Sequence, residues 1–248
     1  MTVGGPPASP DSPLGSYAVR LGDDALVLAQ RLAWWSSRAP ELEEDLALTN
    51  IALDLLGQAR TLLSSIGDED ELAFLRSDRE FRNLLIVEQP NGDFAQTVAR
   101  QLLFSTFQLA RYEALIGHED ETINGVAGKA VKEVRYHLDH AVQWTVRLGD
   151  GTDESHARMQ AALDRLWPYT HEMLAHDDFE AEVGVDPARL QEGWDAAITQ
   201  TLEVATLKIP ADDGWRPAGG RRGQHSEGLS YLLAEMQSLH REHPGATW

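Results

Sequence analysis

The histidines are the side chains whose spacing could reveal a metal site in this sequence, which holds nine of them and no cysteine. Helical-bundle oxidases bind two irons through a Glu-x-x-His motif on each of two helices and a glutamate on each of two others, because residues three apart share a helical face. None of the nine histidines has a glutamate three residues before it. At that spacing His137 follows Val134, and His140 follows His137. The sequence therefore contains no intact di-iron motif.

Two looser arrangements also keep metal-ligating residue types on one helical face. Glu133 lies four residues before His137, with His140 one turn further on, and Glu172 lies four residues before His176. Such pairs arise easily by chance in charged helices, so hydrogen-bonded or surface pairs are the favoured interpretation. Metal ligation through them is kept as an alternative.

One basic, glycine-rich segment, GGRRGQH at 219–225, interrupts an otherwise acidic chain. Arg221 and Arg222 could hold a phosphate or the carboxylate of a partner, and a solvated turn is the simpler interpretation. The chain has no Gly-x-Ser-x-Gly elbow and no glycine-rich nucleotide motif. We therefore assign no catalytic residue and no cofactor-binding residue.

Helices must position these side chains, because apolar residues recur at helical spacing along most of the chain and no run of alternating β-branched residues is found. The expected helices cover residues 23–37, 40–66, 93–112, 121–148, 153–175, 187–206 and 226–240. Long helices joined by short turns predict an all-α fold built on a helical bundle. The helix over 94–112 contains no Asp or Glu, so it offers no interior carboxylate to a metal.

The helix over 40–66 carries two apolar stripes. One consists of Leu42, Leu46, Leu53, Leu56 and Leu63, and the other of Leu48, Ile51, Leu55, Leu62 and Ile66. A helix this apolar is expected to pack against neighbours on more than one side.

Charge and composition exclude several classes of function. The chain has 21 Lys and Arg against 40 Asp and Glu, a formal charge of −19, so nucleic acid and anionic membranes are not expected partners. A partner protein with a basic face is favoured instead. No signal peptide or membrane span is visible, and we expect a cytoplasmic protein. Residues 1–15, rich in proline and glycine, predict a disordered tail before a single domain over 16–248.

Five segments resemble the PaaC family, the structural subunits of the multicomponent phenylacetyl-CoA 1,2-epoxidase (ring 1,2-phenylacetyl-CoA oxygenase). They are GDDALVLAQRLAWW, APELEEDLALTNIALDLLGQAR, FRNLLIVEQPNGDFAQTVARQ, KAVKEVRYHLDHAVQWTVRLGDGT and GGRRGQHSEGLSYLLAEMQ. The resemblance implies a ferritin-like four-helix bundle core with additional helices. It also implies a heteromer with a PaaA-like catalytic subunit that carries the di-iron centre, and further subunits including a reductase.

The resemblance also implies where the iron ligands of the catalytic relative would fall. Leu55 stands at a glutamate position and Gln58 at the matching histidine, while Val134 stands at the second glutamate and His137 is retained. Gln30 falls near the glutamate of the first helix, through an alignment that needs a gap. Leucine and valine have no lone pair to offer iron, so no metal and no cofactor is expected in this chain.

Three hypotheses follow. The first is a non-catalytic structural subunit that supports the catalytic partner in aerobic phenylacetate catabolism. The second is a ferritin-like di-metal oxidase, active in its own right, that uses Glu133, His137, His140 and further carboxylates. The third is a coenzyme A binding module acting through Arg221 and Arg222. Whether the isolated chain forms a homodimer is left open.

Overall fold

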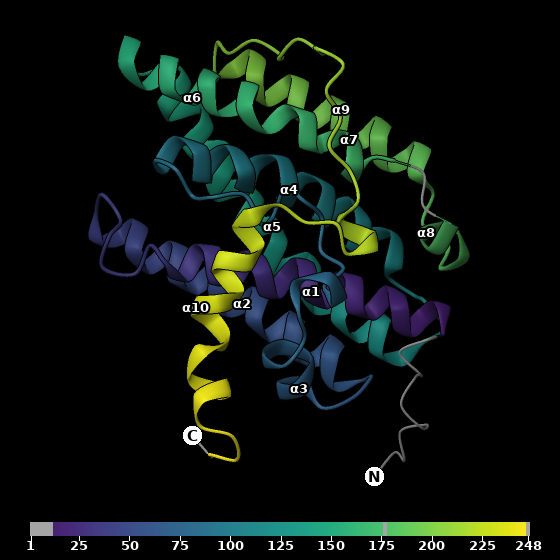
Figure 1. The fold of residues 1–248 in the computed structure, drawn as a ribbon. Helices are drawn as coiled ribbons and strands as arrows, with labels where there is room; N and C mark the ends of the chain where they lie inside the picture. The colour runs from purple at the N-terminus through teal and green to yellow at the C-terminus, as the bar shows by residue number, and fades with distance from the viewer. Residues whose placement is uncertain (1–11, 176–177, 247–248) are drawn as a thin grey trace.

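The computed structural model describes residues 12–175 and 178–246, and every regular element in those ranges is a helix (Figure 1). The all-α prediction is confirmed. The α-helices are α1 (Pro13–Ala33), α2 (Leu42–Ser64), α3 (Glu69–Phe74), α4 (Phe94–Leu115), α5 (Glu121–Gly149), α6 (Asp153–Leu166), α7 (Thr170–Met173), α8 (Asp178–Glu182), α9 (Pro187–Val204) and α10 (Glu227–Glu242). Three short 3-10 helices are η1 (Asp78–Glu80), η2 (Trp167–Tyr169) and η3 (Gly220–Arg222).

Helix α1 begins ten residues earlier than the sequence pattern predicted. The Ser12 side chain accepts a hydrogen bond from the Gly15 amide at 3.0 Å, and Pro13 occupies the first helical turn, where its missing N–H costs nothing. Of the predicted tail, residues 1–11 lie outside the described residues, and residues 13–15 are the first residues of α1. The capping serine was missed because it lies among prolines and glycines.

Aspartate side chains cap the N-termini of α4 and α5. Asp93 accepts from the Gln96 amide at 2.9 Å at the start of α4, and Asp120 accepts from the Ile123 amide at 2.9 Å at the start of α5. The helix expected over 153–175 is instead divided into α6, η2 and α7, because Pro168 lacks the N–H that would continue the α-helical ladder.

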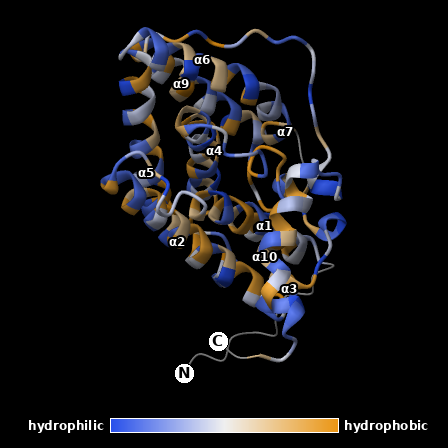
Figure 2. Cartoon of the chain, turned by 60° about the vertical axis from the view of Figure 1, so that its left-hand side comes forward, coloured by the Kyte–Doolittle hydropathy of each residue, from blue (hydrophilic) through white to orange (hydrophobic). Residues whose placement is uncertain are grey.

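Helices α1, α2, α4 and α5 form a four-helix bundle. Helix α1 packs along α2, α4 packs along α5, and α2 contacts α5, while the buried pair Asp24–Arg111 joins α1 to α4. Helices α6 and α9 lie over the outer side of α4, and α10 crosses α1 beside α3 (Figure 1). Figure 2 shows hydrophobic residues concentrated between these helices, with a further set on the outer side of α2.

A glycine allows the close approach of α1 and α2. A Cβ atom on Gly22 would lie 2.9 Å from the Cδ2 atom of Leu63, closer than two carbon atoms can pack. Helix α1 packs along α2, and the second apolar stripe of α2 is buried. Within the described ranges, no helix combines the length and the apolar character needed to span a bilayer.

Candidate functional site

Leu55, Gln58, Val134 and His137, the positions to which the family resemblance assigns lost or retained iron ligands, lie where α2 faces α5. Leu55 of α2 and Val134 of α5 are fully buried, each with 0% of its surface exposed. Gln58, one turn after Leu55, and His137, one turn after Val134, are also buried. Four of the five positions singled out from the sequence thus lie on the two facing helices. Two of them are aliphatic.

Gln58 uses its side-chain amide to join three helices. Its Nε2 donates to the Glu133 Oε2 atom of α5 at 3.0 Å, and its Oε1 accepts from the Tyr112 hydroxyl of α4 at 3.2 Å. Gln108 Nε2 also donates to Gln58 Oε1, at 3.4 Å. Glu133 in turn pairs with Lys129 at 3.0 Å. The amide therefore serves as a neutral hydrogen-bonding link between helices.

His137 and His140 each face a different carboxylate of α2. His137 Nε2 lies 3.1 Å from the Asp54 Oδ2 atom, and His140 Nε2 lies 2.8 Å from the Glu44 Oε2 atom. Because a carboxylate can only accept, each of these nitrogens is the donor when the acid is ionised. The two histidines therefore link α5 to α2 at separate points along the line where these two helices pack, which we call the seam.

This set of donors does not fit a di-iron centre. Leu55 and Val134 have no lone pair, and the one carboxylate of α4, Glu113, is half-exposed and pairs with Arg135 at 2.8 Å. Within residues 12–175 and 178–246, no three His, Asp or Glu side chains are grouped so that they could hold a metal ion.

Gln30 is not brought to the seam. It lines a surface pocket of about 570 Å³ between the end of α1 and α10, together with Trp34 and Tyr231. The buried α1 side chains near it are Leu28 and Leu32, which belong to the hydrophobic core. Aliphatic side chains therefore also fill the α1 side of the bundle.

Glu172, the acid of the second loose pair, binds backbone amides. Its Oε1 accepts from Gly219 and Gly220, both at 2.8 Å, and its Oε2 accepts from Leu85 at 2.7 Å. The carboxylate thus holds the loop that precedes α10 against the residues that precede α4. Its proposed companion, His176, lies outside the described residues.

Arg221 contacts the interior of the chain. Its guanidinium donates to both oxygens of Asp24, at 3.0 and 2.8 Å, and to the Arg82 carbonyl at 2.7 Å. Asp24 also accepts from Arg111, and both of these side chains are fully buried. Burial works against the charge on Arg111, but Asp24, Tyr17 and Glu180 together outweigh it and raise the pKa of Arg111.

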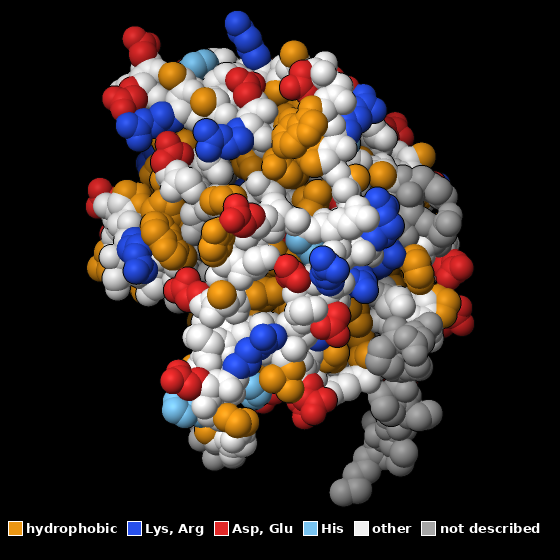
Figure 3. Space-filling view, viewed as in Figure 1, with side chains coloured by type: hydrophobic (Ala, Val, Ile, Leu, Met, Phe, Trp, Pro, Cys, Tyr) orange, Lys and Arg blue, Asp and Glu red, His pale blue; other side chains and the backbone are white. Residues whose placement is uncertain are grey.

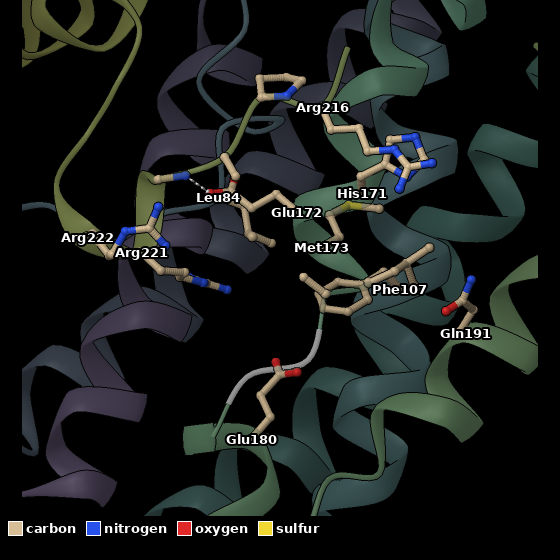
Figure 4. Close-up of a pocket in the computed structure, with 15 residues that line it drawn as sticks. Leu84, Phe107, His171, Glu172, Met173, Glu180, Gln191, Arg216, Arg221 and Arg222 are labelled. Atoms are coloured by element: carbon tan, nitrogen blue, oxygen red, sulfur yellow. Dashed lines mark hydrogen bonds between the residues drawn. The ribbon is translucent and has the colours of Figure 1, made fainter. Parts of the chain in front are cut away.

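Arg222 is exposed at the rim of a pocket of about 500 Å³. Figure 4 shows Arg221 and Arg222 on one side of this pocket and Arg216 with His171 on the other. In Figure 3 basic side chains gather near η3 on a surface that otherwise mixes both charges. Of the two arginines singled out from the sequence, Arg222 is the one that faces solvent.

The buried ion cluster of Asp24, Arg111 and Arg221 was not anticipated from the sequence. Two signals were available: adjacent acids, Asp23 and Asp24, inside an apolar stretch, and Arg111 near the end of a long helix that has no acid one turn away from it. Charged residues in such places are expected to be paired when buried. Arg221 pairs with Asp24 from 197 positions away, so the pair could not be identified from sequence spacing.

The chain matches the family model described as phenylacetic acid catabolic protein over residues 5–248. It is 46% identical over 246 residues to the C-type subunit of 1,2-phenylacetyl-CoA epoxidase from Escherichia coli (strain K12), with 95% of this chain and 99% of that protein covered. A solved structure, protein 19 with aldehyde deformylating oxidase activity from Synechococcus, aligns with a TM-score of 0.58 at 17% identity. That alignment covers 78% of this chain and 91% of the other, and it shows a shared ferritin-like helical fold.

Proposed function

Because the chain belongs to the phenylacetic acid catabolic protein family, we propose that it is a non-catalytic structural subunit of a phenylacetyl-CoA epoxidase. In this proposal a PaaA-like partner carries the di-iron centre and epoxidises the aromatic ring of the thioester. A reductase subunit supplies the electrons. The identity to a protein named as one of the subunits of that epoxidase, over nearly the whole length of both chains, supports the role.

The observation that carries the non-catalytic role is the burial of aliphatic side chains where the iron ligands would be. Leu55 and Val134 are fully enclosed, so neither can be replaced in the ligand set by a water molecule entering from solvent. Gln58 is engaged by three neighbours. A bundle filled this way keeps the shape of an oxidase and gives its partner a rigid neighbour.

The runner-up is a metal oxidase that uses Glu133, His137 and His140. The contacts of these side chains favour the structural role, because each binds a different group. Glu133 binds Gln58 and Lys129, His137 binds Asp54, and His140 binds Glu44. A binuclear site requires ligands that converge on one point.

Reconstitution from separately purified subunits tests the proposal. We expect no epoxidation of phenylacetyl-CoA by this chain with the reductase alone. We expect activity from the PaaA-like partner to rise, together with its thermal stability, when this chain is added. Turnover by this chain and the reductase without the partner would contradict the non-catalytic role and favour the metal oxidase.

A further inference from the structure

The surface pocket of about 570 Å³ between the end of α1 and α10 has a basic lining. Two arginines, Arg31 and Arg38, supply positive charges against one acid, Glu235. This balance is the reverse of that of the whole chain, whose formal charge is −19. The volume lies in the range of about 300–1,000 Å³ that is typical of small-molecule sites. We name this cavity the α1–α10 pocket, and its size and charge suit a small anion.

The two arginines of the α1–α10 pocket bind backbone carbonyls of the chain and keep further donors. Arg31 donates from Nε to the Glu88 carbonyl at 3.1 Å and from Nη2 to the Gly228 carbonyl at 2.8 Å. Arg38 donates from Nη1 to the Trp34 carbonyl at 3.0 Å. Within residues 12–175 and 178–246, neither forms an ion pair with a carboxylate, and Arg31 Nη1 and Arg38 Nη2 have no acceptor. Guanidinium N–H groups match carboxylate and phosphate oxygens, so these donors remain for an anion.

A third arginine is linked to the α1–α10 pocket through Asn91, which lines it. Arg100 is 1% exposed and donates to the Gln89 carbonyl at 2.6 Å and to the Asn91 Oδ1 atom at 2.7 Å. Its Nε atom is buried and has no acceptor in the described part of the chain. Burial, together with the nearby charge of Arg31, lowers the pKa of Arg100 to about 9. An anion in the pocket would offset the repulsion between these two arginines.

Aromatic and apolar side chains form much of the remaining wall. Trp34 is 45% exposed and Tyr231 is 67% exposed, and Leu232 and Met236 lie beside them in the lining. The Arg38 guanidinium carbon lies 4.9 Å from the centroid of the Trp34 ring, so positive charge and an aromatic surface occur together. Exposed indole and phenol rings can pack against a planar group, which a bare inorganic anion does not have. The lining therefore favours an anion that carries a ring.

We propose that the α1–α10 pocket binds a small organic anion in which a carboxylate or a phosphate is attached to an aromatic ring system. Arg31 and Arg38 hold the anionic group, and the ring packs against Trp34 and Tyr231. Phenylacetate and adenine nucleotides are two sources of this chemistry. The site is separate from Leu55 and the seam, and it requires no partner subunit. Its failure would therefore leave the proposed function unaffected.

Calorimetric titration of the full-length chain, in a buffer free of phosphate and sulfate, tests the ligand class. The titrants are phenylacetate, adenosine monophosphate and inorganic phosphate, of which the last has the charge without a ring. We expect at least one ring-bearing anion to bind with a Kd about tenfold or more below that of inorganic phosphate. The anion that binds more tightly identifies the source. The same anion should raise the melting temperature of the chain, because it binds the folded state.

Variants of two exposed residues locate the site. We expect Arg38→Gln to raise the Kd by about tenfold, since it removes a charged donor, and Trp34→Leu to raise it by about fivefold, since it removes the ring. The matched controls are Arg189→Gln, 88% exposed on α9, and Trp215→Leu, 54% exposed before η3. Both controls should keep the Kd within about twofold of wild type. Circular dichroism establishes that all four variants are folded.

Three results would overturn the assignment. If no titrant binds at concentrations up to about 10 mM, the α1–α10 pocket is not an anion site. If inorganic phosphate binds as tightly as both ring-bearing anions, the aromatic wall contributes nothing and the ligand class is wrong. If a ring-bearing anion binds and both Arg38→Gln and Trp34→Leu leave its Kd unchanged, the ligand lies elsewhere on the chain.

Discussion

The side-chain amide of Gln58 on α2 donates to the carboxylate of Glu133 on α5 over 3.0 Å, at a position to which the family resemblance assigns an iron-binding histidine of the catalytic relative. The other oxygen of Glu133 is 3.0 Å from Lys129, so its charge is balanced without a metal. The seam is therefore held by side-chain hydrogen bonds and aliphatic packing. Its stability should depend on those residues and be independent of iron.

Leu55 should contribute to stability as a core residue. We expect Leu55→Ala to lower the free energy of unfolding by about 2–5 kcal/mol, because it leaves a cavity in a fully buried position. Leu53→Ala, two residues away and 59% exposed, should change it by less than about 0.5 kcal/mol in the isolated chain. Urea denaturation checks both values. Equal effects would show that Leu55 is not packed as described.

Removing the Asp24 carboxylate should lower the free energy of unfolding far more than removing a surface acid. We expect Asp24→Ala to destabilise the chain by about 3–5 kcal/mol, because Arg111 would stay buried with only the more distant carboxylate of Glu180, at 3.9 Å. The surface pair Arg60–Glu69 is the control: its arginine is 68% exposed, and Glu69→Ala should cost less than about 1 kcal/mol. Denaturant unfolding of both variants measures the difference. A loss below that of the surface pair would contradict the buried cluster.

The two neighbouring arginines of the GGRRGQH segment should behave differently. Arg221→Ala should lower the melting temperature of the isolated chain, because it removes two hydrogen bonds to the buried Asp24 carboxylate. Arg222→Ala should leave the melting temperature unchanged, since Arg222 is exposed. Binding of phenylacetyl-CoA to the assembled complex is measured for both. Loss of that binding on Arg222→Ala would favour the coenzyme A module over the structural subunit.

His225 should give part of the stability a dependence on pH. Burial works against its charged form, but Glu88, 2.7 Å from its Nδ1 atom, outweighs this and raises the pKa of His225 above its ordinary 6.5. A raised folded-state pKa stabilises the fold fully below pH 6.5, and this contribution is lost as pH rises through the raised value. As the pH rises through that range, the melting temperature of wild type should fall more steeply than that of His225→Gln. Parallel curves would contradict the pairing.

The sequence predicted the central helices well because each has a local signal. Helix α5 was expected over 121–148 and spans Glu121–Gly149, and α2 was expected over 40–66 and spans Leu42–Ser64. Asp120 and the acidic first turn of α2 mark these starts directly. Helix α8 was missed, since five residues are too few to show a helical period.

Contacts between distant segments could not be predicted from one sequence. The family resemblance assigned Leu55 and Val134 to ligand positions of one metal site, and the structure brings both to the facing sides of α2 and α5. Gln30, whose placement rested on an alignment with a gap, lines a surface pocket away from Leu55 and Val134, and a shift of one residue turns a side chain by about 100° around a helix. For Arg221 the sequence favoured a solvated turn over contact with a phosphate or a partner carboxylate, and its guanidinium binds Asp24 within the chain.

The proposal that this bundle supports oxygen chemistry without binding iron is tested most directly by metal analysis. The chain is purified alone from iron-supplemented cells, and also as the complex with its PaaA-like partner. We predict no stoichiometric iron or manganese in the isolated chain, and iron in the complex that stays with the partner when the subunits are separated. Near-stoichiometric metal in the isolated chain, lost on changing His137 or Glu133, would contradict the proposal.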